Sequence, residues 1–388
     1  MKRNICVVTG GRMDYGHLYL LLKEIKNNDN LDLYIITTCM HLSPEFGLTY
    51  KKIISDGFKI YKNIECLLSS DTSVGVAKSV GLATIGFADA LSELNPNIVL
   101  LLGDRFELLA AAQAALFLKI PIAHISGGDT TEGAYDESIR HSITKMAHLH
   151  FVTNKDSFLR VRQLGENPKK IFNVGSPSID LIKSTIYLNK YELEKRLNIK
   201  FRKYNFLITY HPATLEIENS MIEISNLLDS LKTYGEEYCF IFTKSNADDG
   251  GRKINELITK HVIENKNNYL FDSLGQQVYY SLIKFSNGVI GNSSSGITEV
   301  PTFGKATINI GNRQKGRLAA SSVITIEAKK EQITAAIKNI LMSDFSKTIS
   351  PYGQGNTSKK IVEILENIKI DKNNLQKKFF DLKINENI

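Results

Sequence analysis

The chain has 388 residues, of which 43% are hydrophobic and 23% are charged, with a formal net charge of +7. Because a typical domain has ~100–200 residues, we expect two domains that each bury a core of their own. The composition is that of a globular protein and excludes a disordered or collagen-like chain. The surplus of lysine and arginine suits an anionic small ligand. The lack of a basic motif interleaved with aromatic residues argues against a nucleic-acid partner.

Targeting and redox signals are few. The apolar runs fall far below the ~20 residues of a membrane-spanning helix. The first apolar stretch ends at Thr9, which is short for the ~7–15 residues of a signal-peptide core followed by a cleavage site. We therefore expect a cytoplasmic protein without a membrane partner. The cysteines Cys6, Cys39, Cys66 and Cys239 lack CxxC spacing, which predicts free thiols, no disulfide framework and no metal site.

Apolar segments of strand length alternate with stretches of helical periodicity, which is typical of βα units in parallel sheets. The strands expected in the first half are Asn4–Thr9, Leu33–Thr38, Ile98–Leu102, Ile120–Ile125 and His150–Thr153. The helices expected between them are His17–Lys26, Phe106–Lys119 and Glu137–Ala147. The pattern predicts an α/β fold.

A second series of strands follows after a polar region. Its expected members are Phe206–Tyr210, Tyr238–Thr243, Gly288–Ile290 and Ala306–Ile310. The hinge is predicted between Gly175 and Lys203, which gives an N-terminal domain over 1–180 and a C-terminal domain over 181–388. Both domains read as Rossmann-like, nucleotide-binding sheets. A last helix is expected over Ser358–Ile368, with one apolar stripe.

Two common nucleotide cradles are missing from the sequence. Neither GxGxxG after a strand nor GxxxxGK[ST] occurs, so hydride transfer with a dinucleotide and ATP hydrolysis both lose support. Tyr280 and Lys284 match the YxxxK spacing of NAD-dependent sugar epimerases, but without the glycine fingerprint we interpret them as part of a structural helix face. No cofactor is therefore expected.

Two candidate sites lie at strand ends in the first half. The segment Gly10–Gly16 joins a strand to a helix, where backbone amides and Arg12 favour a phosphate, although a plain strand-to-helix turn would look the same. Asp104 follows a buried strand at the carboxyl edge, where open α/β sheets bind ligands. Its alternative role is to cap the next helix.

The segment from His124 to His141 combines a glycine-rich loop with a helix. On the helix, Asp136 and Arg140 share one face, as do Glu137 and His141, because each pair is four residues apart. A solvated ion-pair face would look similar. The position directly after a strand and a glycine turn favours a functional site.

The second half offers groups suited to a nucleotide. His211 ends a buried strand and should face the ligand, although a lone histidine is often structural. Asn292, Ser293, Ser294, Ser295 and Gly296 present hydroxyls and amides to a diphosphate. Glu299 is spaced to accept ribose hydroxyls, and Arg313 adds a nearby cation.

Together these motifs resemble the UDP-N-acetylglucosamine 2-epimerase family, in particular its hydrolysing branch, over nearly the whole chain. The most specific signals are Gly103–Glu107, His124–His141, Gly291–Gly296 and Arg313–Arg317. The resemblance implies a glycosyltransferase-B-type architecture with the active site in an interdomain cleft. It also implies a last helix, at about 358–368, that returns to the N-terminal domain, and a homodimer.

The resemblance implies chemistry without NAD. A base removes the C2 proton of a UDP-sugar, UDP leaves from C1, and water adds to the resulting glycal with inverted C2 configuration. Asp104 and Asp136 match acidic positions that act as acid or base, with Glu137 beside them, and Arg140 matches the family's helix arginine. His211 matches the histidine near the leaving group. Ser293, Ser294 and Glu299 match the UDP-binding segment.

One departure from the family pattern concerns Ser126, which stands where many relatives carry a catalytic glutamate. Either Asp129 or Glu132 substitutes from the same loop, or the substrate needs different contacts at C4 and C6. The run Thr131–Glu137 resembles enzymes that act on UDP-N,N′-diacetylbacillosamine, which we favour as substrate over UDP-N-acetylglucosamine. A glycosyltransferase of the same architecture and a non-catalytic UDP-sugar sensor are the competing interpretations.

Overall fold

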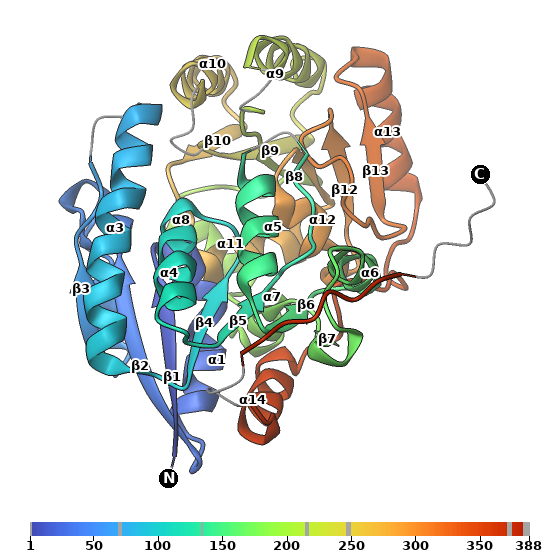
Figure 1. Cartoon of the computed structure of the whole chain (residues 1–388). Helices are drawn as coiled ribbons and strands as arrows, with labels where there is room; N and C mark the ends of the chain where they lie inside the picture. The colour runs from blue at the N-terminus through green and yellow to red at the C-terminus, as the bar shows by residue number, and fades with distance from the viewer. Residues whose placement is uncertain are drawn as a thin grey trace. The chain divides into compact units, whose positions relative to one another are not determined.

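The structure is a computed structural model that describes residues 2–68, 72–132, 135–213, 217–245, 250–370 and 375–382. The chain divides into two compact units, each built around a parallel sheet (Figure 1). Unit 1 comprises Met1–Asp129, Tyr135–Leu181 and Tyr352–Ile388, and unit 2 comprises Thr130–Ala134 and Ile182–Pro351. The predicted α/β class with two parallel sheets is confirmed.

The sheet of unit 1 has seven parallel strands in the order β3-β2-β1-β4-β5-β6-β7. Its strands are β1 (Arg3–Thr9), β2 (Leu31–Thr38), β3 (Ile60–Ile64), β4 (Ile98–Leu102), β5 (Ile122–Ile125), β6 (Leu149–Val152) and β7 (Ile171–Asn173). Successive side chains of a strand point to opposite faces. In β1, Ile5 and Val7 therefore join the core on one face, and Cys6 and Val8 join the core on the other.

Helices cover both faces of this sheet (Figure 1). One face packs against α1 and α14, and the other packs against α3, α4 and α5. The helices of unit 1 are α1 (Arg12–Lys26), α2 (Tyr50–Ser55), α3 (Ser73–Leu94), α4 (Phe106–Phe117), α5 (Asp136–Met146), α6 (Lys155–Gln163) and α14 (Thr357–Asn367), with α7 (Pro177–Ser184) crossing the boundary to unit 2. Short 3-10 turns are η1 (Cys39–Leu42), η2 (Pro44–Phe46) and η3 (Pro168–Lys170). The two helix layers bury the continuous apolar runs of the strands between them, as a parallel sheet requires.

Helix α1 starts five residues before the expected start at His17, because Gly11 is its N-cap and Arg12 its first residue. The glycine at position 16 lies inside the helix and interrupts the apolar pattern, which hid the first turn from the sequence prediction.

Helix α3 was not anticipated from the sequence. By length and composition it is the one helix among the described residues that could cross a membrane. In unit 1 it packs against α4 and buries Ala83, Phe87 and Leu91 completely. Full burial of a side chain such as Phe87 contributes about 1.5–3 kcal/mol, so α3 has the packing of a core helix.

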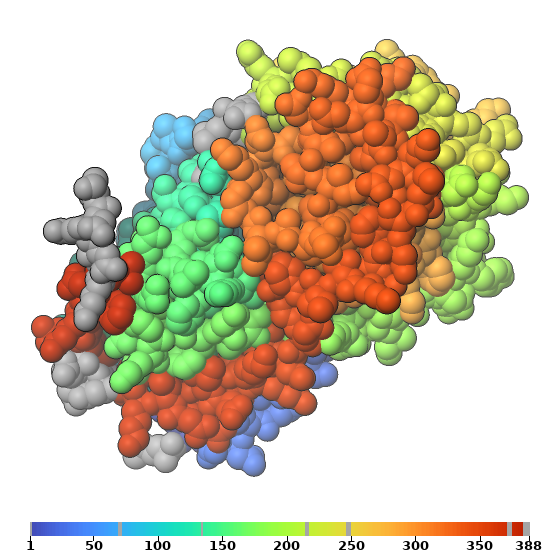
Figure 2. Space-filling model, turned by 90° about the vertical axis from the view of Figure 1, so that its right-hand side faces the viewer, coloured from blue at the N-terminus to red at the C-terminus, as the bar shows by residue number. Residues whose placement is uncertain are grey.

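The chain returns to unit 1 after Pro351, where α14 packs beside α1 (Figures 1 and 2). Asp180 caps this helix, because its two carboxylate oxygens accept hydrogen bonds from the backbone N–H groups of Thr357 (2.9 Å) and Ser358 (2.6 Å). The apolar stripe of α14 is buried through Ile361, Val362 and Leu365.

Unit 2 is built on a six-stranded parallel sheet in the order β10-β9-β8-β11-β12-β13. Its strands are β8 (Tyr204–Thr209), β9 (Tyr238–Thr243), β10 (Asn268–Phe271), β11 (Gly288–Gly291), β12 (Ala306–Ile310) and β13 (Val323–Ile326). Its helices are α8 (Lys190–Leu197), α9 (Ile217–Leu231), α10 (Gly251–Glu264), α11 (Gln276–Phe285), α12 (Ser294–Thr298) and α13 (Lys330–Met342), with the 3-10 turn η4 (Val300–Phe303). Helices α9, α10 and α13 cover one face. The sheet also contacts α11, α12 and η4.

Candidate active site

A buried guanidinium gathers the acidic groups predicted in unit 1. The Arg140 side chain is only 2% exposed and forms an ion pair with Asp104. Its Nη1 also donates to Glu137 Oε2 at 2.7 Å and to the carbonyl of Asp129 at 2.8 Å. Burial by itself would lower the pKa of this guanidinium, but the surrounding acids, Asp104 foremost, raise it. Arg140 is therefore a fixed cation that holds β4, the β5–α5 loop and α5 together.

The helix α5 brings a second acid–base pair to this cluster. His141 Nε2 lies 3.0 Å from Glu137 Oε1, so both oxygens of Glu137 have a partner on the same helix. The spacing of four residues had placed this pair on one face, and the structure agrees. Asp136 is the first residue of α5.

The turn that carries Asp104 is held by a buried histidine. His124 on β5 is fully buried, with Nε2 2.7 Å from the carbonyl of Gly103 and Nδ1 3.1 Å from Thr144 Oγ1. Burial lowers the pKa of His124 to about 4, so its imidazole is neutral near pH 7. His124 was predicted as the first residue of the His124–His141 motif, but not in this supporting role.

The loop after β5 carries Ser126, the residue expected to stand where relatives have a glutamate. Ser126 has a positive φ of 64°, a conformation that favours glycine. Asp129 accepts hydrogen bonds at Oδ1 from Thr153 Oγ1 (2.6 Å) and Ser157 Oγ (2.5 Å), and from Asn154 Nδ2 at 3.5 Å. These contacts favour a structural role for Asp129, as the acceptor that ties the loop to the start of α6.

A second acidic cluster in unit 1 was not predicted. Arg105 Nε lies 2.6 Å from Glu107 Oε1 and 4.0 Å from Asp14 Oδ2. Glu107 is fully buried, and its Oε2 and Asp14 Oδ2 have no hydrogen-bond partner among the described residues. Burial is the main cause that raises the pKa of Asp14 to about 7. One cation thus faces two acids at the end of β1.

The glycine at the end of β1 is required by this second cluster. A Cβ at Gly10 would collide with the carboxylate of Glu107. The glycine pair that suggested a phosphate turn is thus explained in part by the close approach of a side chain. Arg12 is exposed at the first position of α1, as a phosphate-binding role would need.

In unit 2, His211 is held at the end of β8 by Asn292. The N–H of His211 donates to Asn292 Oδ1 at 2.8 Å, and Asn292 Nδ2 donates to the His211 carbonyl at 2.7 Å. Asn292 was expected to bind the nucleotide directly. Asn292 is 1% exposed and its side-chain amide bonds to the backbone of His211, which favours a supporting role over direct contact with the nucleotide.

Glu299 is held by two hydroxyl groups. Tyr280 OH donates to Oε1 at 2.9 Å and Ser295 Oγ donates to Oε2 at 2.6 Å, while Tyr279 OH donates to Ser295 Oγ at 3.0 Å. A carboxylate has about four acceptor positions, so two remain for ligand hydroxyls. Burial and the neighbouring Glu299 raise the pKa of Tyr280, whose hydroxyl stays a neutral donor. The structural interpretation of the YxxxK match agrees with this geometry, because Lys284 lies over the ring of Tyr187 instead.

The serine-rich segment continues β11 into α12. A Cβ at Gly291, which has φ 138°, would collide with the carbonyl of Thr209, so only glycine fits. Ser293 is the N-cap residue of α12 and Ser294 its first residue. The carbonyl of Gly296 accepts a hydrogen bond from Thr307 Oγ1 at 2.7 Å.

The loop after β12 brings cations to the same strand ends. Arg313 Nη1 donates to the Asn292 carbonyl at 3.0 Å. Arg317 donates to the Thr130 carbonyl at 2.9 Å, and Lys315 Nζ lies 3.7 Å from Glu132 Oε2. The half-exposed Glu132 side chain thus belongs to unit 2, where it lies beside these cations.

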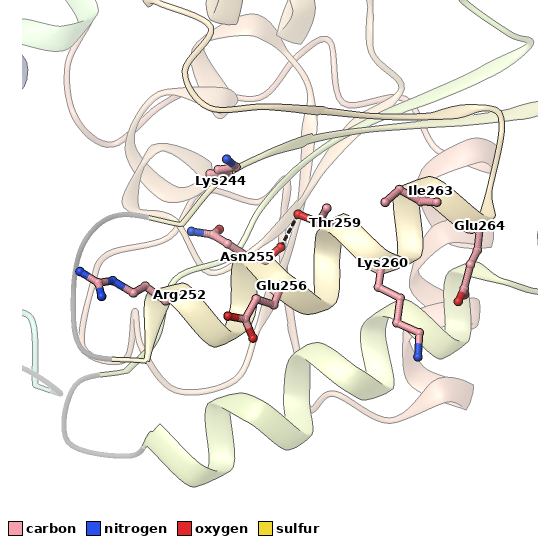
Figure 3. A pocket seen from close by; sticks show the side chains of 8 residues that line it. All are labelled: Lys244, Arg252, Asn255, Glu256, Thr259, Lys260, Ile263 and Glu264. Carbon is pink, nitrogen blue, oxygen red and sulfur yellow. Dashed lines mark hydrogen bonds between the residues drawn. The ribbon is translucent and has the colours of Figure 1, made fainter.

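A surface pocket of about 590 Å³ lies along α10 (Figure 3). Its lining residues are Lys244, Arg252, Asn255, Glu256, Thr259, Lys260, Ile263 and Glu264. None of them is a predicted site residue, and cations alternate with acids along it. Within the part of the chain that the structure describes, no cluster of three or more histidine, cysteine or acidic residues is arranged to hold a metal ion.

The predicted residues therefore form one set in each unit. Unit 1 gathers Asp104, Asp129, Glu137 and Arg140, and unit 2 gathers His211, Asn292, Ser295, Glu299 and Arg313. That the two sets face one another across a cleft stays a prediction.

Comparison with known proteins identifies the family. A profile described as UDP-N-acetylglucosamine 2-epimerase matches residues 23–366. The GDP/UDP-N,N′-diacetylbacillosamine 2-epimerase (hydrolyzing) of Campylobacter jejuni is 48% identical over 327 residues, which cover 84% of this chain and 85% of that protein. The UDP-N,N′-diacetylbacillosamine 2-epimerase (hydrolyzing) of Legionella pneumophila is 33% identical over 378 residues, which cover 97% and 99%.

Solved structures show the same fold. The UDP-GlcNAc 2-epimerase from Neisseria meningitidis bound to UDP-GlcNAc superposes with a TM-score of 0.79 at 20% identity and covers 93% of this chain and 99% of its own. The Methanocaldococcus jannaschii UDP-GlcNAc 2-epimerase in complex with UDP-GlcNAc and UDP has a TM-score of 0.76 at 18% identity, with the same coverage. By profile, sequence identity and fold, the chain belongs to the UDP-N-acetylglucosamine 2-epimerase family.

Proposed function

We propose that the chain is a hydrolysing 2-epimerase that converts UDP-N,N′-diacetylbacillosamine into UDP and 2,4-diacetamido-2,4,6-trideoxymannose. The names of the Campylobacter and Legionella relatives support this activity. The observation that carries it is the buried Arg140, which holds Asp104 and Glu137 in fixed positions at the carboxyl edge of the first sheet. The product would serve legionaminic, or more generally nonulosonic, acid biosynthesis.

Unit 1 would supply the acid–base chemistry. Removing a C2 proton and returning one to the opposite face needs two groups that exchange protons, and carboxyl groups commonly do so. Asp104 is 27% exposed while its partner Arg140 is 2% exposed, so the carboxylate is open to a substrate and its position is fixed from behind. Asp136 lies one helical turn before Arg140 and would be the second group.

Unit 2 would hold the nucleotide. The departing diphosphate gains negative charge as the C1–O bond breaks, so donors and cations that meet it stabilise the transition state. His211 and Arg313 would meet this charge, with Ser293 and Ser294 beside them. Glu299 retains acceptor capacity for the ribose hydroxyls, because each of its oxygens accepts one side-chain hydrogen bond from the described residues.

The alternative substrate is UDP-N-acetylglucosamine, which would give N-acetylmannosamine for sialic acid. Ser126 favours the first substrate, because a serine where relatives carry glutamate changes the contacts around the sugar. A glycosyltransferase of the same architecture is a further alternative. A homodimer in the cytoplasm stays a prediction.

The test is incubation of the protein with each UDP-sugar in deuterium oxide. The proposal expects free UDP and a C2-deuterated mannosamine-type sugar, whereas return of intact UDP-sugar contradicts it. Asp104→Asn should abolish turnover and leave UDP affinity nearly unchanged, which a non-catalytic sensor would not show. Release of UDP only after an acceptor is added, with C2 hydrogen retained, would favour the glycosyltransferase. Mass spectrometry of the products from both UDP-sugars in competition identifies the preferred substrate.

A further inference from the structure

The ends of β8 and β11 are joined beyond the last backbone pair of the sheet. The sheet register ends with Gly291 opposite Thr209, and the N–H of Asn292 then donates to the Thr209 carbonyl at 3.2 Å. His211 lies two residues past β8 and has no strand residue opposite it. The side chain of Asn292 takes that place, because an amide side chain carries the same donor and acceptor as a peptide group.

We propose that Asn292 is a positioning residue that fixes the His211 imidazole through two hydrogen bonds to the His211 backbone. The inference rests on the proposed function, in which His211 meets the leaving group. With both backbone groups held, at 2.8 Å and 2.7 Å, the Cα–Cβ direction of His211 is fixed relative to the sheet. Preorganised donors stabilise developing charge best when they need no rearrangement during the reaction.

The same asparagine also organises the cationic loop. Its carbonyl accepts hydrogen bonds from Arg313 Nη1 at 3.0 Å and from the buried Gln314 Nε2 at 2.8 Å. One buried residue therefore sets the position of two groups that would meet the diphosphate. Its own amide is consumed by these internal contacts, so its contribution to the reaction is indirect.

Asn255, on α10, repeats the arrangement at Ser245, two residues beyond the end of the neighbouring strand β9. Asn255 Oδ1 accepts a hydrogen bond from the N–H of Ser245 at 2.8 Å, and its Nδ2 donates to the Ser245 carbonyl at 3.5 Å. Ser245 Oγ lies 3.4 Å from Nδ1 of His211. The hydrogen bond at one ring nitrogen sets which nitrogen carries the proton. Ser245 thus contacts the ring of the same histidine whose backbone Asn292 holds.

The opposite ends of β8 and β11 provide a matched control. There Asn287 Oδ1 accepts a hydrogen bond from the N–H of Asn205 at 2.8 Å, and the N–H of Asn287 donates to the Asn205 carbonyl at 2.7 Å. Asn287→Ala removes a side-chain hydrogen bond between the same two strands. It should lower thermal stability much as Asn292→Ala does, but leave the contacts of His211 unchanged.

The experiment measures kcat, KM and UDP affinity of the full chain and its variants with the UDP-sugar that the wild type turns over. Asn292→Ala should lower kcat about 100-fold, the scale of a small misplacement of a reacting group. UDP affinity should change less than kcat does. Asn292→Asp keeps the acceptor for the His211 N–H but places a carboxylate against the His211 carbonyl. Its kcat should therefore lie between those of the wild type and Asn292→Ala. Asn287→Ala should keep kcat within about twofold, because its hydrogen bond lies outside the site.

A double-mutant cycle separates positioning from a loss of structure. In the His211→Ala background, Asn292→Ala should lower kcat less than about threefold further, because its effect passes through His211. An equal loss in both backgrounds, or wild-type kcat in Asn292→Ala, overturns the inference. Wild-type protein without turnover would contradict the proposed function instead.

A measurement that needs no turnover tests the inference even if the wild type is inactive on both UDP-sugars. NMR of the imidazole nitrogens, assigned with His211→Ala, should show a changed tautomer balance or pKa for His211 in Asn292→Ala and in Ser245→Ala. Asn287→Ala should leave both unchanged. Identical His211 signals in Asn292→Ala and wild type would overturn the inference whatever the substrate.

Discussion

Asp104 and Arg140 form an ion pair although 36 positions separate them in the sequence. The guanidinium is 2% exposed and the carboxylate 27% exposed, so the buried partner holds the open one in place. This asymmetry separates a group that supports the site from a group that a substrate can reach.

Replacement of Arg140 should damage both stability and activity. Arg140→Met leaves Asp104 and Glu137 without their buried partner, and breaking such a pair costs about 3–5 kcal/mol. Arg140→Lys keeps the charge but loses the planar fork that meets several acceptors at once, so a smaller loss is expected. Urea denaturation and UDP release measure the two effects. The exposed Arg252→Met serves as control, and equal effects of the two Met variants would contradict the prediction.

Variants at Asp129 distinguish a structural acceptor from a catalytic base. Asp129→Asn keeps an Oδ1 acceptor for Thr153 and Ser157, so UDP release should stay within about threefold of wild type, whereas loss of a general base costs about 10²–10⁴-fold. Asp129→Ala removes the acceptor and should lower the free energy of unfolding by about 1–3 kcal/mol. A 100-fold loss of activity in a stable Asp129→Asn variant would assign the base role to Asp129 after all.

The protonation of Asp14 should make stability depend on pH. Burial raises its pKa to about 7 in the folded chain, while an unfolded aspartate loses its proton near pH 4. The folded state therefore binds more protons between these values, and its stability falls as pH rises through this window. Asp14→Asn should remove this fall, which amounts to at most about 4 kcal/mol.

Urea midpoints at about pH 5 and pH 8 measure this dependence, since the two values lie on either side of the predicted titration. The exposed Asp89→Asn serves as control and should keep the wild-type slope. The same slope in Asp14→Asn and wild type would show that Asp14 is ionised throughout.

Residues 375–382 lie against unit 1 (Figure 2), and Lys377 is expected to contribute to holding them there. Lys377 Nζ lies 2.7 Å from the buried Glu166 and donates to the carbonyls of Lys145 and Ala147 at 2.6 Å. Lys377→Met should lower local stability by about 1 kcal/mol, because Glu166 keeps its contacts with Lys145 and His150.

Amide hydrogen exchange measures this local stability. The N–H of Phe380 donates to the Gly165 carbonyl at 2.9 Å, and its exchange should be several-fold faster in Lys377→Met. The neighbouring Lys378 is exposed, and Lys378→Met should leave the rate unchanged. If both variants exchange alike, Lys377 does not hold this segment.

The sequence predicted the inner strands of both sheets and missed the outer ones. All nine expected strands are present, and the four unexpected ones, β3, β7, β10 and β13, are the edge strands of the two sheets. An inner strand is buried on both faces and reads as a continuous apolar run. Edge strands such as β10 are only partly buried, so their residues are mixed and the pattern is lost.

The candidate site divides in a similar way. Asp104, Arg140 and His211 were predicted because a polar group directly after a buried strand, or in a glycine-rich turn and the helix after it, stands out locally. The pairing of Arg105 with Glu107 and Asp14, and the role of Asn292, were not predicted. The contacts of Arg105 with Asp14 and of Asn292 with His211 join segments far apart in the chain, and the spacing of residues carries no record of them.

The amino-acid sequence by itself determined the α/β class, the inner strands and the residue types at their ends, because apolar periodicity and turn residues act over a few neighbouring positions. Only the tertiary structure decided which of those polar groups support others and which stay open to a ligand. That distinction depends on burial and on which distant side chain fills each hydrogen bond, and both are properties of the packed chain.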